Sequence, residues 1–307
     1  MRIAVPDLIS NSYFPAVAAV ELGFFKAEGL DAELELVFPV PRTMEMLRDG
    51  ELDFVAGAAH ATLQAFPNWN GAKLLASLAQ NTYWLLVLRS DLNAKVGDVN
   101  AVKGLKIGAA PGPDSTIRQL IIEAGIDLEK DHVEVGPVPG STGAGVSFGV
   151  NAAKALEDGI IDGFWANAMG SEVAVRSGIG TVVLDARRGI CPPAAVHYTF
   201  GALVTTDAMI ENNPETAKAA IRAIVNVQKA LKEDPSRATA VGEKLFPPDE
   251  AGMIAGLIER DLPFYDPSIS QEAISGMNRF AKDIGLLTED VTYDQVVASQ
   301  FSGLWTE

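Results

Sequence analysis

Three polar side chains near the amino terminus can hydrogen-bond a small molecule. Ser10, Asn11 and Tyr13 follow the apolar segment 2–6, where a strand would end and a helix would begin. Hydroxyl, amide and phenol groups can all contact a ligand, but serine and asparagine are also common helix N-caps. The residue types leave both roles open.

Two further candidates can carry a positive charge. Arg42 lies in the loop 38–43, where its guanidinium can bind a carboxylate, sulfonate or phosphate or can simply be solvated. His60 lies in the small-residue loop 56–62, where a helix should begin. It can contact a ligand or serve as a structural hydrogen-bond partner. We treat both as candidate ligand contacts and keep the structural alternatives open.

A polar pair separates two apolar segments in the first third of the chain. Asn81 and Thr82 lie between the segments 72–79 and 83–89. Such a pair is unusual for a plain hairpin. The tyrosine and tryptophan that follow it can be ligand walls or core residues. We expect Asn81 and Thr82 to orient a ligand.

The second of the two repeated α/β units, which starts near residue 106, offers a turn that is typical of an anion site. Ser115 and Thr116 end the segment 111–116, at an expected helix start, where hydroxyls and unpaired N–H groups can bind an anion or form an ordinary cap. A second turn of this kind can form at 141–143. It lacks the Gly-Lys-Ser/Thr ending of a nucleotide-binding loop.

Aromatic residues suggest the shape of the ligand. Trp165 is the last residue of the apolar segment 161–165, and Asn167 lies just after it. Trp165 can stack on a planar ligand or belong to the core. Together with Tyr13 and the Tyr83-Trp84 pair, it favours a small, partly planar solute. Nitrate and bicarbonate would be small for such walls.

Metal, disulfide and catalytic chemistry are not expected. Three histidines (His60, His132 and His197) and the single cysteine, Cys191, show no metal-ligand spacing. One cysteine cannot form an intrachain disulfide. We therefore predict no catalytic residue, no metal and no cofactor.

The elements that must position these residues alternate between strand and helix. The segment 2–6 is followed by a helix that stops at Gly23, a strand at 31–37, a helix that stops at Gly50 and a third strand. The same order restarts at 106–109. This alternation predicts an α/β protein with largely parallel sheets, whose strand carboxyl ends form a ligand crevice.

The two halves echo one another, which predicts two lobes. A helix ends at Gly50 and the next strand enters through Asp53, as a later helix ends at Gly159 and its strand enters through Asp162. We expect the first lobe to hold residues 1–90 and 201–307 and the second lobe residues 91–200. Crossings near 89–91 and 198–202 would act as hinges.

Composition excludes several classes of protein. The net charge of −16 disfavours nucleic acid as a partner. No segment approaches the roughly 20 apolar residues of a membrane span. The chain starts in a strand, without a secretion leader, so we expect either a cytoplasmic protein or one whose leader was removed.

Three segments carry a family resemblance that covers roughly residues 1–290: Gly-Phe-Phe-Lys-Ala-Glu-Gly-Leu at 23–30, Gly-Glu-Leu-Asp at 50–53 and Lys-Gly-Leu-Lys-Ile-Gly at 103–108. They resemble the substrate-binding proteins of ABC importers, in the nitrate/taurine/sulfonate and thiamine-pyrimidine-precursor branch. The resemblance implies a type II periplasmic-binding-protein fold with a ligand cleft between two lobes. It also implies a monomeric, periplasmic or membrane-associated extracytoplasmic receptor. Such a receptor closes on a small anionic or aromatic, sulfonate-like solute and delivers it to an ABC permease.

Two enzymes are similar in fold and leave one alternative. An aromatic sulfinate desulfinase uses a cysteine nucleophile in the first lobe, and a pyrimidine synthase of thiamine biosynthesis carries a cysteine-rich motif. Here Phe-Lys-Ala-Glu occupies 25–28, and Cys191 stands alone. We therefore predict that the chain is not an enzyme. The alternative is a cofactor-independent, cytoplasmic enzyme that uses His60, with Cys191 as its potential nucleophile.

Overall fold

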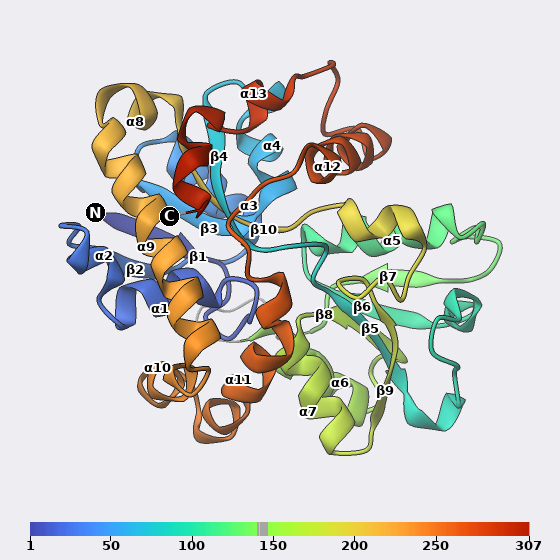
Figure 1. Ribbon diagram of the computed structural model, residues 1–307. Helices are drawn as coiled ribbons and strands as arrows, with labels where there is room; N and C mark the ends of the chain where they lie inside the picture. The colour runs from blue at the N-terminus through green and yellow to red at the C-terminus, as the bar shows by residue number, and fades with distance from the viewer. Residues whose placement is uncertain (140, 142–146, 307) are drawn as a thin grey trace.

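The computed structural model describes residues 1–139, 141 and 147–306, and it has two lobes that each contain a five-stranded sheet (Figure 1). The first sheet has the order β2-β1-β3-β10-β4, and β10 runs antiparallel to both of its neighbours. Its strands are β1 (Arg2–Val5), β2 (Glu33–Leu36), β3 (Phe54–Ala58), β4 (Ala72–Ala79) and β10 (Gly201–Thr206).

The second sheet repeats this arrangement with the order β7-β6-β8-β5-β9, and here β5 is the antiparallel strand. Its strands are β5 (Leu85–Arg89), β6 (Lys106–Ala109), β7 (Glu134–Gly136), β8 (Gly163–Ala166) and β9 (Gly180–Asp185). The fold is therefore the predicted mixed α/β, type II periplasmic-binding-protein fold.

Helices cover both sheets. Those that follow strands of the second sheet are α5 (Pro113–Glu123), α6 (Phe148–Glu157) and α7 (Ala168–Arg176). The others are α1 (Phe14–Glu21), α2 (Phe24–Ala27), α3 (Val40–Arg48), α4 (Thr62–Ala65), α8 (Asp207–Asn212), α9 (Pro214–Glu233), α10 (Arg237–Leu245), α11 (Pro248–Asp261), α12 (Gln271–Asp283) and α13 (Tyr293–Val296). Helix α11 packs against α10 of the first lobe and α7 of the second, and it lies between the lobes in Figure 1.

The internal echo has a physical basis in both sheets. The carboxylate of Asp53 accepts the amide N–H of Arg2 at 2.7 Å, and that of Asp162 accepts the amide N–H of Lys106 at 2.9 Å. Each aspartate thus fixes the first residue of the neighbouring parallel strand. As predicted, Gly50 follows the end of α3 and precedes β3. Its φ of +75° is left-handed, a conformation that often ends a helix and that glycine adopts most easily.

The chain crosses to the second sheet earlier than the sequence indicates. The segment 83–89 was expected in the first lobe, with the crossing at 89–91, but β5 is hydrogen-bonded to β8 and β9. The first crossing therefore lies at 80–84, between β4 and β5, and the second at 186–200, between β9 and β10. An apolar strand suits either sheet, because its partners are distant in sequence. The division into two moving lobes stays a prediction.

Within the described part of the chain, none of the helices has both the length and the apolar character that a membrane crossing requires.

Candidate functional site

A hollow lies between the lobes, at the carboxyl ends of parallel strands from both sheets, where the sequence predicted a ligand crevice. Its empty volume, including the mouth that opens to solvent, is about 430 Å³. We call it the interlobe cavity. Its described lining consists of Pro6, Asp7, Ser10, Tyr13, Phe38, Val40, Tyr83, Trp84, Ala110, Pro113, Phe148, Trp165, Ala166 and Asn167.

Asp7 is the one carboxylate in this described lining. It follows β1, and its side chain accepts the amide N–H of Ile9 at 2.9 Å and the Asn167 amide of the second lobe at 2.7 Å. Burial raises the pKa of Asp7 to about 6, although these hydrogen bonds favour the ionised form. Asp7 therefore contributes both a tie between the lobes and a hydrogen-bond acceptor in the cavity.

Two phenols meet on one wall of the cavity. The hydroxyl groups of Tyr13, the N-cap residue of α1, and Tyr83, in the first crossing, are hydrogen-bonded to each other, and their rings pack edge to face. Burial raises the pKa of both phenols, so both stay protonated at neutral pH. Only one proton can lie in their mutual hydrogen bond, and the other is available to a ligand.

A buried hydroxyl faces the same space. Ser10 lines the cavity at 1% exposure, and its Oγ has no hydrogen-bond partner in the described structure. Buried polar atoms are nearly always paired in folded proteins. A ligand is therefore a natural partner for this hydroxyl.

The indole of Trp165 is fixed by the second lobe. Its Nε1 donates to the hydroxyl of Thr116 at 2.8 Å, and its ring lies 6.3 Å from that of Trp84. Phe38 and Phe148 complete an aromatic enclosure around the cavity. Rings at these positions suit a flat apolar ligand.

Four of the predicted ligand contacts line the cavity: Ser10, Tyr13, Trp165 and Asn167. Two others lie behind the lining. Asn11 is buried and donates its side-chain amide to Asp261, and Thr116 donates to the carbonyl of Pro113 while it holds Trp165. The two act on the site indirectly.

Arg42 does not reach the cavity. It is exposed and pairs with Glu45 at 3.1 Å and Glu51 at 3.5 Å. Its neighbouring acids at the end of α3 explain this placement, since a solvated guanidinium pairs with the nearest carboxylates.

The expected anion turn at 115–116 is not open to a ligand. The Ser115 hydroxyl donates to the carbonyl of Gly112 at 2.7 Å, and its amide points at the same oxygen. The amide of Asp114 is paired with Ala110, and the Asp114 carboxylate accepts the amide of Gly112. The donors at the start of α5 are thus used within the turn. The second expected turn, at 141–143, lies largely outside the described residues.

Asn81 and Thr82 connect the two crossings instead of lining the cavity. The Asn81 side chain donates to the carbonyl of Arg187 at 3.0 Å. The Thr82 hydroxyl accepts the amide of Thr199 at 3.2 Å and lies 3.3 Å from its carbonyl. Their polarity serves the junction between the lobes.

His60 lies one layer behind the cavity. It is 1% exposed, its ring packs edge-on against Trp84 and Phe280, and neither ring nitrogen has a partner in the described structure. Burial lowers its pKa to about 4, so it is neutral at physiological pH. Burial also raises the pKa of the Cys191 thiol to about 12, which is the opposite of an activated nucleophile.

Sequence reasoning missed Asp7 and a buried ionic cluster. Arg187 and Arg188, which follow β9, both pair with Asp261 at the end of α11, and Arg187 also donates to Ser12 at 2.8 Å. Arg187 and Asp261 are almost fully buried. The consecutive arginines were the available signal, but their partner lies more than seventy residues away.

Among the residues that the structure describes, no group of three or more acidic, histidine or cysteine side chains could hold a metal ion.

Comparisons with known proteins give one family and several similar folds. A family model described as NMT1/THI5 like matches residues 10–238. The nitrate import ATP-binding protein NrtC of Synechococcus elongatus is 27% identical over 271 residues, which cover 82% of this chain but only 38% of that longer protein.

Solved structures of similar fold include receptors and an enzyme. The periplasmic aliphatic sulphonate-binding protein SsuA of Escherichia coli has a TM-score of 0.70 at 15% identity and covers 97% of this chain and 91% of its own. For the periplasmic nitrate-binding protein NrtA of Synechocystis PCC 6803, the TM-score is 0.68 at 16% identity, and the match covers 99% of this chain and 86% of that chain. For the desulfurization enzyme DSZB, the TM-score is 0.65 at 16% identity, and the match covers 98% of this chain and 97% of that chain.

Proposed function

The chain belongs to the NMT1/THI5-like family, and from this membership and the interlobe cavity we propose that it is the extracytoplasmic solute-binding component of an ABC importer. The observation that carries the proposal is the origin of the cavity walls. The first lobe contributes Tyr13 and Asp7, and the second contributes Trp165 and Asn167. Neither lobe could enclose a ligand alone.

The mechanism we propose is hinge closure. A solute that contacts both lobes binds the closed arrangement better than the open one and therefore shifts the population toward closure. The crossings at 80–84 and 186–200 would absorb the change, and the Thr82–Thr199 hydrogen bonds hold them side by side.

The proposed partner is an ABC permease in the membrane. The matched relative is named as the ATP-binding protein of an import system, and the similar sulphonate and nitrate receptors are named as periplasmic. These names support an importer component that works outside the cytoplasm. We further propose that it is a monomer and that, with a net charge of −16, it binds no nucleic acid.

The enzyme alternative has weaker support. A desulfurization enzyme shares the fold, but His60 and Cys191 are both absent from the described cavity lining. His60 is separated from the cavity by Trp84, and the Cys191 thiol is held protonated. We therefore propose a receptor that returns its solute unchanged.

The test is a thermal-shift screen of sulfonates, aromatic carboxylates, aromatic amines, polyamines and small anions, with mass spectrometry of any compound carried through purification. We expect one chemical class to raise the melting temperature and to be recovered unchanged. Small-angle scattering should show a more compact protein with that compound. A compound recovered as a different molecule, or an unchanged lobe angle with a tight ligand, would refute the proposal.

A pair of variants makes the screen specific. Ala110 lines the cavity, whereas Ala27 is exposed on α2. Ala110→Leu should fill part of the cavity and weaken binding by about tenfold or more. Ala27→Leu adds the same atoms elsewhere and should leave binding unchanged. Equal binding by the two variants would place the ligand outside this cavity.

A further inference from the structure

The interlobe cavity has an electrostatic character that points to one chemical class of solute. We propose that it selects a small, flat, neutral or cationic molecule that carries N–H donors, and that it rejects carboxylates, sulfonates and nitrate. This inference depends on the proposed function and deepens it, because it specifies the solute of the same site.

The first argument is the charge of the lining. Asp7 is an acid, and the described lining holds no lysine or arginine to balance it. Residues 140 and 142–146, which lie outside the description, are glycine, threonine, alanine and valine in the sequence and carry no charged side chain. An anion entering this cavity would meet a like charge without a counter-ion.

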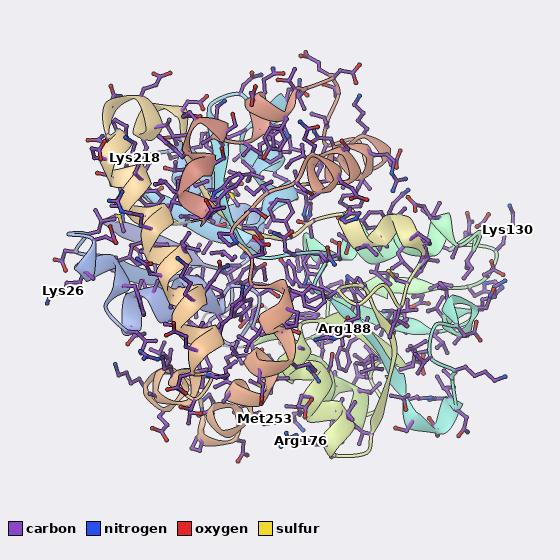
Figure 2. All side chains as sticks on the ribbon, viewed as in Figure 1. Lys26, Lys130, Arg176, Arg188, Lys218 and Met253 are labelled. Carbon is purple, nitrogen blue, oxygen red and sulfur yellow. The ribbon has the colours of Figure 1, made fainter. Side chains whose placement is uncertain are left out.

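The nearest basic side chains do not change this balance. The Arg187 guanidinium lies 5.7 Å from the Tyr83 ring centroid, but it is bound to Asp261. Arg188 is shared between Asp185 and Asp261, and it lies near the junction of the lobes in Figure 2. The other labelled cations of that view, such as Lys26 and Lys130, lie at the periphery. The positive charge near the site is therefore already neutralised.

The second argument is the supply of donors, which an anion would need. At the start of α5 the amides of Gly112, Asp114 and Ser115 are already paired within the turn. The start of α7 is capped by Asn167, whose oxygen accepts the amide of Gly170. Among the side chains of the described lining, the donors left unpaired are the Ser10 hydroxyl, one phenol and the Trp84 indole N–H, and none of them is charged.

Helix dipoles do not reverse this conclusion. Several helices begin at the cavity, and each amino terminus is equivalent to roughly half a positive charge. The ionised Asp7 carries a full negative charge in the described lining itself, and Asp114 adds a second acid at the start of α5. The local field therefore favours a donor or a cation over an anion.

The third argument is the acceptor that is left over. The Asp7 carboxylate receives the amides of Ile9 and Ser10 and the side chain of Asn167. A carboxylate has about four lone-pair positions, so one position remains for a ligand N–H. Aromatic rings around it add favourable contacts for a flat ring or an organic cation.

The experiment uses three flat probes of one shape and different charge: benzamidine, benzamide and benzoate. Binding to the full chain is measured by calorimetry and by the fluorescence of the cavity tryptophans near neutral pH. We expect benzamidine to bind about tenfold or more tightly than benzoate, with benzamide between them, since a charged hydrogen bond to Asp7 has this magnitude. Asp7→Asn should reduce the preference about tenfold. Asp91→Asn, an exposed acid outside the cavity, should leave it unchanged.

The pH dependence adds a second readout. Tyr13 and Tyr83 face Asp7 and stay protonated, so Asp7 is the group in this wall that titrates near pH 6. The preference for benzamidine should therefore shrink at about pH 5, where Asp7 gains a proton.

Three outcomes would overturn the inference: benzoate binding as tightly as benzamidine, a preference that survives Asp7→Asn, or no binding by any of the three probes. In the first case closure around benzoate would still support the receptor. In contrast, a probe that binds and is chemically altered would refute the receptor itself, so the two failures can be distinguished.

Discussion

Replacing Asp261 by asparagine should destabilise the protein strongly, because it leaves a buried guanidinium without its counter-ion. Asp261 accepts hydrogen bonds from Arg187, Arg188 and Asn11, and its side chain and that of Arg187 are each 2% exposed. Burial alone would raise the pKa of Asp261, but the two guanidinium groups hold it below its ordinary value. The carboxylate is therefore ionised in the folded protein.

The magnitude follows from the burial of both partners. Breaking a buried ion pair from one side costs about 3–5 kcal/mol, because the remaining charge stays desolvated. Arg188 is 27% exposed and keeps its pair with Asp185, so it adds little to this cost. We expect a loss of about 3–4 kcal/mol, a large fraction of the usual stability of a folded protein, and a fall of about 5–6 °C in the melting temperature.

Urea unfolding at neutral pH, followed by circular dichroism, measures this loss. Asp283→Asn is the matched control, since that acid pairs with Arg279 on the surface at 3.4 Å and should change stability by less than about 1 kcal/mol. The double variant Arg187→Met with Asp261→Asn should recover more than half of the loss, because no buried charge is left unpaired. A loss below about 1 kcal/mol for Asp261→Asn would refute the reasoning.

The pH dependence of this difference has a defined sign. A carboxylate whose pKa is lowered by folding stabilises the protein above its unfolded pKa, and this contribution disappears as the pH falls through the folded value. The ordinary pKa of aspartate is 3.8, and that of Asp261 lies below it. The wild-type protein and Asp261→Asn should therefore converge in stability only in the acid range below that value.

Three further predictions concern packing, the buried histidine and Asp7. Gly170→Ala should lower the free energy of urea unfolding by about 1–3 kcal/mol, since the added Cβ would lie 2.4 Å from the backbone of Gly149. Gly252→Ala adds a Cβ in open space on α11 and should instead raise the free energy of unfolding by about 0.5–1 kcal/mol. His60→Phe should keep solute affinity within about twofold and not lower stability, because both ring nitrogens lack partners; a loss of ligand turnover would point to the enzyme. Burial raises the pKa of Asp7 to about 6. Protonated Asp7 therefore contributes stability below its ordinary pKa, and this contribution is lost as the pH rises through about 6. Above pH 6, Asp7→Asn should be about 1 kcal/mol more stable than wild type in thermal unfolding, with no difference near pH 4.

The fold could be predicted because its signals are local. Helix stops at Gly23 and Gly50 and the entry of strands through Asp53 and Asp162 are properties of a few consecutive residues. The position of β5 could not be predicted in the same way. Its five residues, Leu85–Arg89, pair with β8 and β9. The residues of an apolar segment do not by themselves determine which of the two sheets the strand joins.

The candidate site was predictable where a residue's role depends on its own strand. Trp165 is the last residue but one of β8 and Asn167 follows the strand, so the rule that ligands bind at strand carboxyl ends was sufficient to place both at the cavity. Arg42 and Ser115 satisfy the same rule, but their neighbours Glu45 and Gly112 engage them. The sequence shows which side chains could bind a ligand. Only the structure shows which of them are already bonded to neighbouring residues.

Asp7 shows why the charge of a site is difficult to predict. In the sequence it is one of 40 acidic residues in an acidic chain, and it follows a proline in an apparently ordinary loop. Burial raises its pKa, and the hydrogen bond from Asn167 of the second lobe, 160 positions away, offsets part of that rise. The pKa of Asp7 therefore depends on a contact between the two lobes.

The same linkage connects closure to the choice of solute. The cluster around Asp261 lies beside the crossings and satisfies its charges within the protein. The Asp7–Asn167 contact lies in the cavity wall and buries a carboxylate that keeps one acceptor position free. In the proposed closure, a ligand N–H would reduce the energetic cost of burying Asp7, whereas an anion would increase it. The proposed closure would thus favour the bound state of one chemical class, and Asp7, whose burial opposes folding at neutral pH, would be the residue that makes this selection.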